Sequence, residues 1–407
     1  MGRPLTGMER GLFKTDLAAP LNFTTVARVS GPLDDGALRA ALPALRARHP
    51  HLRERIEHGE LVDDDVPPLT LRIGSDDWVH ELEHEINTPV GAPLARFVRC
   101  ADRLLVTLHH VVGDGWSGVY LMRDWLRAAA GEALEPLTDP GGVDSLIRGA
   151  PGVSNHARFL GRELVMTRHG WPVKVRREVQ AFAYERRARV RHVVLDAEPI
   201  AARARAEKTT VHGALSAAML LAILNDAGRS KASVNFGSPV NVRGAAGVGE
   251  ELGFYVSMLS LRAVLRADAP FWDVARTVRR SLEADLQRKL QLSLISLMPT
   301  LWNVIGADEV EPKTLARAFE LAVPTTSGLT NLGRLDVQTR FGALTLEECH
   351  FAPNPSALGD FVGTATSLNG RLFWNLVWTD PVMSAAHADA LVADMVARLS
   401  GSLSDSR

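Results

Sequence analysis

Residues 104–117 read LLVTLHHVVGDGWS, an apolar run that ends in two adjacent histidines, followed by an aspartate between two glycines. The apolar run predicts a strand, and the next segment, WSGVYLMRDWLRAAAGE (116–132), repeats apolar residues at helical spacing. Because side chains alternate along a strand, His109 and His110 are expected to point to opposite faces. We therefore interpret His109 as a structural histidine and His110 as the histidine that takes part in the chemistry.

The turn after the histidine pair contains Gly113, Asp114 and Gly115. The two glycines permit unusual backbone angles and close packing, and Asp114 is placed to accept hydrogen bonds or to pair with an arginine. The backbone N–H groups of Gly115 and Trp116 begin the predicted helix and are candidates to stabilise an oxyanion. Ser117 follows no nucleophile-elbow pattern, so we expect it to be a helix-cap hydroxyl.

A second histidine motif, HELEH at 80–84, matches a zinc-protease pattern. On a helix, His80 and His84 lie one turn apart and could bind a metal together, with Glu81 as general base. The pattern fixes only three residues, and the residues that follow supply no third ligand at metzincin spacing. A charged surface helix is therefore preferred, and a zinc hydrolase is the last of the alternatives.

Strand-like and helix-like segments occur in both halves of the 407-residue chain. The patterns predict strands at 21–31, 94–100, 103–110, 231–243, 254–265, 336–351 and 371–380, the first followed by a helix from residue 33 that stops at Pro50. Further helices are expected at 76–87, at 116–131, twice within 196–224, at 270–301 and at 384–399, and a Gly- and Pro-rich loop at 131–156. This mixture indicates an α/β protein, and the length favours two subdomains.

The totals exclude some partners. The net charge is −1, from 46 basic and 47 acidic residues, and aromatic residues are 6%, so we expect no nucleic-acid partner. Cys100 and Cys349 form no disulfide framework, which fits a cytoplasmic protein, and Cys349 is better explained as a buried residue than as a nucleophile.

Two further stretches leave alternatives open. The apolar stretch 292–306 is too short to span a bilayer and predicts a buried helix kinked at Pro299, or a wall of an acyl-binding tunnel. The basic stretch 168–192 could contact the phosphates of CoA or an acidic carrier protein, although a solvated connector is preferred.

The segment HHVVGDG (109–115) resembles the HHxxxDG signature of the condensation-domain and CoA-dependent acyltransferase superfamily. Further segments resemble other parts of that superfamily in the same order along almost the whole chain. They are PLTGMERGLF (4–13), LRARHPHLRERI (45–56), GSPVNVR (237–243) with LGFYVSML (252–259), and TSGLTNLGRL (326–335). The last is similar to a late motif of stand-alone polyketide-associated, mycocerosyltransferase-like acyltransferases, whereas the WS after HHVVGDG is similar to peptide-synthetase condensation domains.

This resemblance implies two chloramphenicol-acetyltransferase-like subdomains, residues 1–175 and 176–407, arranged in a V around a central tunnel. His110 would be the general base. By the same resemblance, His109 and Asp114 would be structural support, with Arg243 as the salt-bridge partner of Asp114. Among the remaining residues, Gly115 is a further candidate for structural support, and Trp116, Ser117 and Asn331 are candidate oxyanion or substrate contacts.

The implied activity is transfer of an acyl group from a thioester, on CoA or an acyl carrier protein, to a hydroxyl of a polyketide, lipid or other natural-product acceptor. No resident cofactor or metal is expected, since the acyl thioester is a co-substrate. An amide-forming free-standing condensation enzyme and a non-catalytic carrier-protein-binding domain remain as alternatives. We expect a cytoplasmic monomer without a membrane span.

Overall fold

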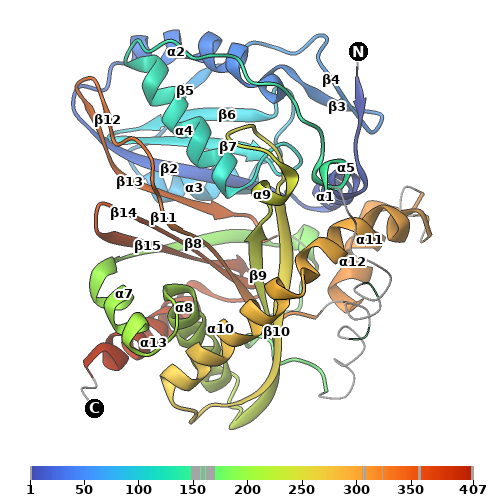
Figure 1. Ribbon diagram of the computed structural model, residues 1–407, viewed down its shortest axis with the longest axis vertical. Coiled ribbons are helices and arrows are strands. Elements are labelled where there is room, and N and C mark those ends of the chain that lie inside the picture. The colour runs from blue at the N-terminus through green and yellow to red at the C-terminus, as the bar shows by residue number, and fades with distance from the viewer. Residues whose placement is uncertain are drawn as a thin grey trace.

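Two six-stranded mixed sheets form the framework of the protein, one above the other in Figure 1. The computed structural model describes residues 2–147, 156, 161, 170–304, 306, 309–322, 324–355 and 359–404. Helices cover the sheets, so the predicted α/β class with two subdomains is confirmed.

The upper sheet carries the strand that ends in the histidine pair. Its strand order is β12 (Arg340–Phe341), β13 (Leu344–Pro353), β2 (Asn22–Ser30), β7 (Arg103–His109), β6 (Ala95–Cys100) and β5 (Leu71–Ile73). On one face, α2 (Asp35–Arg48) and α4 (Gly115–Ala129) pack over a core that includes Trp125, Leu104 and Val106. A small sheet of β1 (Arg3–Pro4), β4 (Glu60–Val62) and β3 (Arg55–Glu57) lies beside α1 (Gly7–Ala18) and α5 (Val143–Leu146) in Figure 1.

The lower sheet has the order β10 (Val256–Arg266), β9 (Lys231–Asn241), β11 (Ser327–Arg334), β14 (Phe361–Leu368), β15 (Arg371–Asp380) and β8 (Arg187–Asp196). The almost wholly buried helix α8 (Val211–Asp226) is the centre of its core, because it lies against β9 and β11 and is itself covered by other helices. These are α7 (Ala197–Ala206), α10 (Phe271–Gln287) and α13 (Ala385–Ser404). Near α1 lie α11 (Leu290–Val304) and α12 (Pro312–Ala322).

Two parts of the chain join the sheets. Strand β13 follows β11 in the sequence but pairs along the whole of β2 in the upper sheet, while it also contacts β14 and β15. The loop between β9 and β10, residues 242–255, contains the single turn α9 (Arg243–Ala246) and reaches up to α4 (Figure 1). Helix α3 (Trp78–Asn87) lies between β8 and the upper sheet. The division of the chain at residues 175/176 itself stays a prediction.

The structure differs from the expected elements in several places. The single helix predicted for 270–301 is two helices, because α10 ends at Gln287 and Lys289 takes a left-handed conformation with φ 56°. Pro299 lies inside α11 without ending it. The predicted loop 131–156 contains α5 among its described residues, and 148–155 lie outside them, as do 168–169 of the basic stretch and 305 of the apolar stretch.

No helix in the described ranges is both long and apolar enough to cross a membrane.

Candidate active site

The histidine pair lies where β7 passes into the turn before α4. The strand ends at His109, one residue earlier than predicted, and His110 is the first residue of the turn. Backbone bonds hold both residues, because the N–H of His109 donates to the carbonyl of Leu94 and the N–H of His110 to that of Leu21. The two side chains have different environments, as the interpretation of one structural and one chemical histidine requires.

His109 is held on both ring nitrogens. Its Nδ1 accepts a hydrogen bond of 3.1 Å from the N–H of Val111, and its Nε2 lies 3.2 Å from Oδ2 of Asp16. Because Nδ1 accepts, the ring proton is on Nε2 and is donated to the carboxylate. The side chain is buried and both nitrogens are used, so His109 fixes the turn and has no nitrogen left for substrate.

His110 is held on one nitrogen only. Its Nδ1 lies 2.8 Å from the carbonyl oxygen of Gly113, which can only accept, so Nδ1 carries the proton and Nε2 carries a lone pair. The rings of Phe23 and Phe254 lie 5.2 Å from the imidazole and fix its orientation. Nε2 has no hydrogen bond among the described residues and keeps contact with solvent.

Burial also sets the charge state of His110. The desolvation of the half-buried ring disfavours the imidazolium and lowers the pKa of His110 below the ordinary value of 6.5, against a smaller opposing effect of the Gly113 hydrogen bond. The imidazole is therefore neutral at pH 7, which is the form that can accept a proton.

Asp114 connects the turn to the lower subdomain. Its buried Oδ1 accepts hydrogen bonds from the N–H of Ser117, as the N-cap of α4, and from Nη2 of Arg243 at 2.9 Å. Its Oδ2 accepts from the N–H of Tyr255 at 3.1 Å. The predicted ion pair between Asp114 and Arg243 is thus present, and it attaches the β9–β10 loop to the start of α4.

Arg243 is itself fixed from several sides. Its Nη1 donates to the carbonyl oxygens of Gly249 and Glu251, and its Nη2 also donates to Oγ of Ser117 at 2.8 Å. Farther along α4, Arg123 forms an ion pair of 2.6 Å with Glu250 of the same loop. These contacts close the loop over α4 at two separate points.

Ser117 is a structural hydroxyl. Its Oγ is buried and lies within 3.3 Å of four partners, which are Asp114, Arg243 and the carbonyl and N–H of Gly253. A hydroxyl with this many partners has no room for an acyl group. The expected helix-cap role of Ser117 is wrong, because the N-cap of α4 is Asp114 and Ser117 lies inside the helix. Cys349 is likewise no nucleophile, because its burial raises the pKa of the thiol to about 12.

The glycines of the turn permit close packing, but the expectation of unusual backbone angles is wrong. Neither Gly113 nor Gly115 has a positive φ. A Cβ on Gly113 would lie 2.8 Å from Cδ1 of Leu108, and one on Gly115 would lie 3.2 Å from both Leu332 and Phe351. Side chains at these positions would displace the walls of the turn.

The remaining expected contacts are the amides at the start of α4 and the side chains of Trp116 and Asn331. The Gly115 and Trp116 amides are in the first turn of α4, where a helix has no backbone acceptor of its own, so they are available to an oxyanion. The Trp116 ring packs against Tyr120, with centroids 5.5 Å apart. Asn331 is not brought to His110 by any contact of the described residues. It borders a cavity in the lower subdomain instead.

The HELEH motif lies on α3, with His80 and His84 exposed. Glu81 is buried and accepts hydrogen bonds from Arg72 and from the N–H of Ser75, and although burial opposes it, the Arg72 contact lowers the pKa of Glu81 to about 2. A carboxylate held in this way is a poor general base. Among the described residues, neither histidine belongs to a group of three metal-ligating side chains.

Among the residues that the structure describes, two other groups have the composition of a metal site. One is His51, Glu54 and Asp139, where the ring lies between the two carboxylates and Arg3 also pairs with Asp139. These side chains satisfy one another and attach the N-terminal strand. These side chains leave no donor atom directed at a metal ion.

The second group is His192, Glu348 and His350, at the junction of the two sheets. Asn375 Oδ1 accepts from Nδ1 of His192 at 2.7 Å, while its Nδ2 donates to Nδ1 of His350 and to the carbonyl of Phe351. The amide therefore places a lone pair on Nε2 of His192 but a proton on Nε2 of His350. Only one of the two imidazoles is in the form that binds a metal, and the remaining ligand, Glu348, is already occupied by Arg103.

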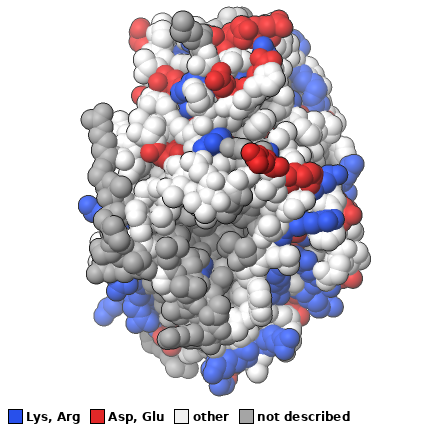
Figure 2. Space-filling view, turned by 90° about the vertical axis from the view of Figure 1, so that its right-hand side faces the viewer, with Lys and Arg blue, Asp and Glu red and all other residues white. Residues whose placement is uncertain are grey.

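The basic stretch 168–192 is largely used in ion pairs in its described part. Arg177 and Arg186 both contact Asp360, and Arg189 contacts Glu83. On the face of the protein in Figure 2, acidic side chains gather at the upper end and lysine and arginine side chains lie along the lower flanks. The ion pairs of Arg177, Arg186 and Arg189 fit the interpretation of residues 168–192 as a connector better than that of a phosphate-binding surface.

Sequence reasoning missed several residues of the site. Asp16 holds His109 from the end of α1, and Phe23 and Phe254 flank His110 from β2 and from the β9–β10 loop. The resemblance of residues 252–259 to the superfamily indicates the segment that contains Phe254. Nothing in the sequence marked Asp16, because its contact depends on how α1 packs.

The chain is similar in sequence to several known proteins. Residues 185–351 match the family model described as the C-terminus of phthiocerol/phthiodiolone dimycocerosyl transferase. The uncharacterized protein Rv2305 of Mycobacterium tuberculosis is 26% identical over 370 residues, which are 82% of this chain and 83% of that protein. A probable non-canonical nonribosomal peptide synthetase, CymA of Salinispora arenicola, is 32% identical over 128 residues, but these are 27% of this chain and only 2% of the synthetase.

Solved structures share the fold over nearly the whole chain. Polyketide synthase associated protein 5 from Mycobacterium tuberculosis superimposes with a TM-score of 0.71 at 18% identity, over 99% of both chains. The trichothecene 15-O-acetyltransferase TRI3 from Fusarium sporotrichioides also gives 0.71, at 12% identity, over 98% of this chain and 94% of that one. The chain therefore shares its fold with condensation domains and acyltransferases of known structure, and its residues 185–351 are similar to the C-terminal part of the dimycocerosyl transferase family.

Proposed function

We propose that the protein is an acyltransferase that moves an acyl group from a thioester to a hydroxyl, with His110 as general base. The observation that carries this proposal is the state of the His110 imidazole. Its Nδ1 proton is donated to the carbonyl of Gly113, and its Nε2 lone pair has no partner in the described part of the chain and is in contact with solvent.

In the proposed reaction, Nε2 of His110 removes the proton of the acceptor hydroxyl while its oxygen attacks the thioester carbonyl. The carbonyl π bond opens to a tetrahedral oxyanion, for which the amides of Gly115 and Trp116 are the candidate donors. When the oxyanion collapses, the C–S bond breaks and the thiolate takes the proton from Nε2. The ester, the free thiol and the neutral imidazole result, and no cofactor or metal takes part.

The remaining site residues position this base. The hydrogen bond to Gly113 and the two phenylalanine rings fix the plane of the imidazole, and Asp114 fixes the turn through α4 and Arg243. Positioned acid–base catalysis contributes about 10²–10⁴-fold, so correct placement of the two substrates supplies much of the remainder.

Ester formation is supported by the family description, which names a mycocerosyl transferase, and by the O-acetyltransferase fold neighbour. Amide formation is the second candidate, because 128 residues of the chain are also similar to part of a peptide synthetase. The donor is an acyl group on CoA or on a carrier protein. A non-catalytic binding domain is disfavoured, because it would not need a free, neutral base in this position.

The test is release of free thiol from acyl-CoA thioesters of short to long chain, and from the matching acyl-pantetheines, with mixed alcohols or amines as acceptors. Wild type is compared with His110→Ala and with His84→Ala, a matched control on an exposed surface histidine. We expect release that His110→Ala lowers at least about a hundredfold and His84→Ala leaves unchanged. Equal release by wild type and His110→Ala would remove His110 as the base.

The preferred acceptor separates the two candidates. Ester product from alcohols, with amines inactive, supports the O-acyltransferase. Product from amines alone supports the condensation enzyme and contradicts the ester assignment.

A further inference from the structure

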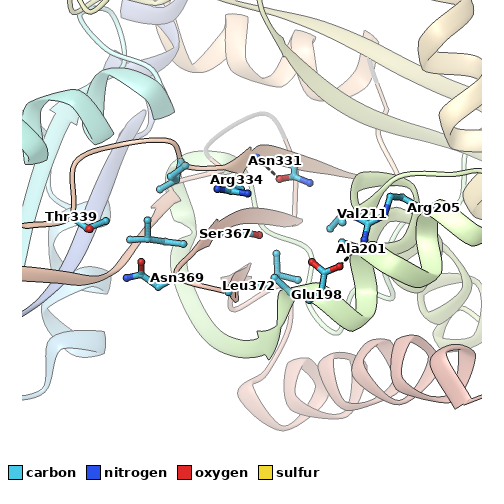
Figure 3. Close-up of a pocket in the computed structure, with 15 residues that line it drawn as sticks. Glu198, Ala201, Arg205, Val211, Asn331, Arg334, Thr339, Ser367, Asn369 and Leu372 are labelled. Atoms are coloured by element: carbon cyan, nitrogen blue, oxygen red, sulfur yellow. Dashed lines mark hydrogen bonds and ion pairs between the residues drawn. The ribbon is translucent and has the colours of Figure 1, made fainter.

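A cavity of about 480 Å³ lies in the lower subdomain, between α7, the first turn of α8, the end of β11 and the turn that joins β14 to β15 (Figure 3). This volume is in the range of small-molecule sites in proteins. The residues around His110 do not line it. The chain segment that leaves β11 and crosses to the upper sheet forms one wall, so we call it the crossover pocket.

The charges of the crossover pocket do not cancel. Glu198 and Arg205 line it from α7 and neutralise each other in an ion pair of 2.6 Å. Arg334 lines it from the end of β11, and within the part of the chain that the structure describes its guanidinium has no ion pair or side-chain hydrogen bond. The lining therefore carries one uncompensated positive charge.

Neutral donors lie along the same walls. Ser367 and Thr339 contribute hydroxyls without hydrogen-bond partners in the described ranges. The Oδ1 of Asn331 accepts from the N–H of Gly333 at 2.7 Å, which leaves its Nδ2 group as a donor (Figure 3). The first turn of α8, which borders the pocket at Val211 and has no acidic residue, adds the positive end of a helix dipole.

We propose that the crossover pocket binds an anionic group of a small molecule, with Arg334 as its counter-ion and Asn331, Ser367 and Thr339 as hydrogen-bond donors. A phosphate and a carboxylate share this chemistry, since both accept the two parallel N–H bonds of a guanidinium. The apolar part of the lining, which includes Ala201, Val211 and Leu372, suits the adjoining carbon chain.

The position of the pocket connects it to the histidine turn. Leu332 packs against Gly115 in the turn that follows the histidine pair. The neighbours of Leu332 in the chain, Asn331 and Gly333, border the pocket. One short stretch of β11 thus contacts both places. The assignment of the bound anion to a substrate rests on the proposed acyl transfer, and the anion is then a CoA phosphate of the donor or a carboxylate of the acceptor.

Binding without turnover tests the proposal. Calorimetric titration of the His110→Ala protein would use two pairs of probes, each an anion and its neutral counterpart. CoA is compared with pantetheine for the phosphate, and 10-hydroxydecanoate with 1,10-decanediol for the carboxylate. We expect the anionic member of one pair to bind more tightly, and that pair identifies the source of the anion.

Variants then locate the binding. Added to that protein, Arg334→Ala should raise the Kd of the preferred anion about tenfold to a hundredfold, as loss of a charge-assisted hydrogen bond does, and leave its neutral counterpart unchanged. Arg334→Lys should lose less, and Ala201→Trp, which fills the pocket, should abolish binding. Arg266→Ala is the matched control, because Arg266 is an exposed arginine on β10 away from the pocket.

The proposal is overturned if neither anion binds more tightly than its neutral counterpart, or if Arg334→Ala has no more effect than Arg266→Ala. These outcomes are independent of thiol release. If the protein binds the anion through Arg334 but shows no His110-dependent thiol release, the proposal for the pocket is supported and the proposal of acyl transfer is contradicted.

Discussion

The guanidinium of Arg243 lies 2.9 Å from the carboxylate of Asp114, and both side chains are buried where the β9–β10 loop meets the first turn of α4. One partner follows the histidine pair by four residues, and the other lies 129 residues away in the chain. The contact therefore links the conformation of the histidine turn to the placement of the lower subdomain.

Removal of Asp114 tests how much this contact contributes. In Asp114→Ala, Arg243 stays buried without a counter-ion and α4 loses its N-cap, so we expect the free energy of unfolding in urea to fall by about 3–5 kcal/mol. Asp268→Ala, which breaks an exposed ion pair with Arg266, is the control and should cost less than about 1 kcal/mol. Losses of equal size would show that burial adds nothing to the Asp114 pair.

Gly118 determines how closely α4 approaches β2. A Cβ there would lie 2.0 Å from Oγ1 of Thr25 and 2.9 Å from Phe23, and the Phe23 ring contacts His110. Gly118→Ala should therefore destabilise the protein by about 1–3 kcal/mol, although alanine is the better helix former by about 1 kcal/mol. It should also lower thiol release, because Phe23 must move.

The matched control is Gly401→Ala in α13, where a Cβ meets nothing within 4 Å. This substitution should raise the thermal midpoint slightly. A gain in stability from both variants would contradict the packing argument for Gly118.

The sequence predicts the histidine turn well because its parts are local. The predicted strand that ends in the histidine pair, the aspartate four residues after His110 and the helix that follows depend on patterns within about fifteen residues. The different environments of the two neighbouring histidines also follow from local geometry, since the strand ends between them.

The tertiary parts of the site could not be derived from local patterns. Arg243 was named from its place in a family motif, whereas Asp16, Phe23 and Phe254 reach the histidines only through the packing of α1, β2 and the β9–β10 loop. The same limit explains the division of 270–301 into two helices. Its apolar spacing continues through Lys289, and only the left-handed conformation of that residue separates α10 from α11.

The pH dependence of thiol release should reflect the burial of His110. Burial lowers the pKa of His110 below the ordinary 6.5, and the base must be unprotonated, so the midpoint of the acidic limb of kcat/KM should lie below pH 6.5. Added imidazole in the His110→Ala protein is the comparison, because a base in solution is not desolvated and its acidic limb should lie at higher pH. An acidic limb for wild type above pH 7 would contradict a depressed pKa.

Asn375 holds two imidazoles at the junction of the sheets, the buried His350 and the half-buried His192. Its Oδ1 accepts from His192, and its Nδ2 donates to His350, so the nearly isosteric Asn375→Leu leaves both Nδ1 atoms without a partner. An unpaired buried polar atom costs about 1–3 kcal/mol, and we expect urea unfolding to show a loss of about 2–4 kcal/mol. Thiol release should change little at temperatures where the variant is folded, since none of these residues contacts His110.

Thr366→Val is the control in the same sheet, because it removes a single buried hydrogen bond, of 2.6 Å to the carbonyl of Cys349, and should cost about 1 kcal/mol.

The tautomers that Asn375 imposes also predict that zinc does not raise the thermal midpoint of the wild type, since Nε2 of His350 carries a proton. A zinc-dependent rise that His350→Gln abolishes would show that the amide does not fix the rings as described, and that this cluster is a metal site after all.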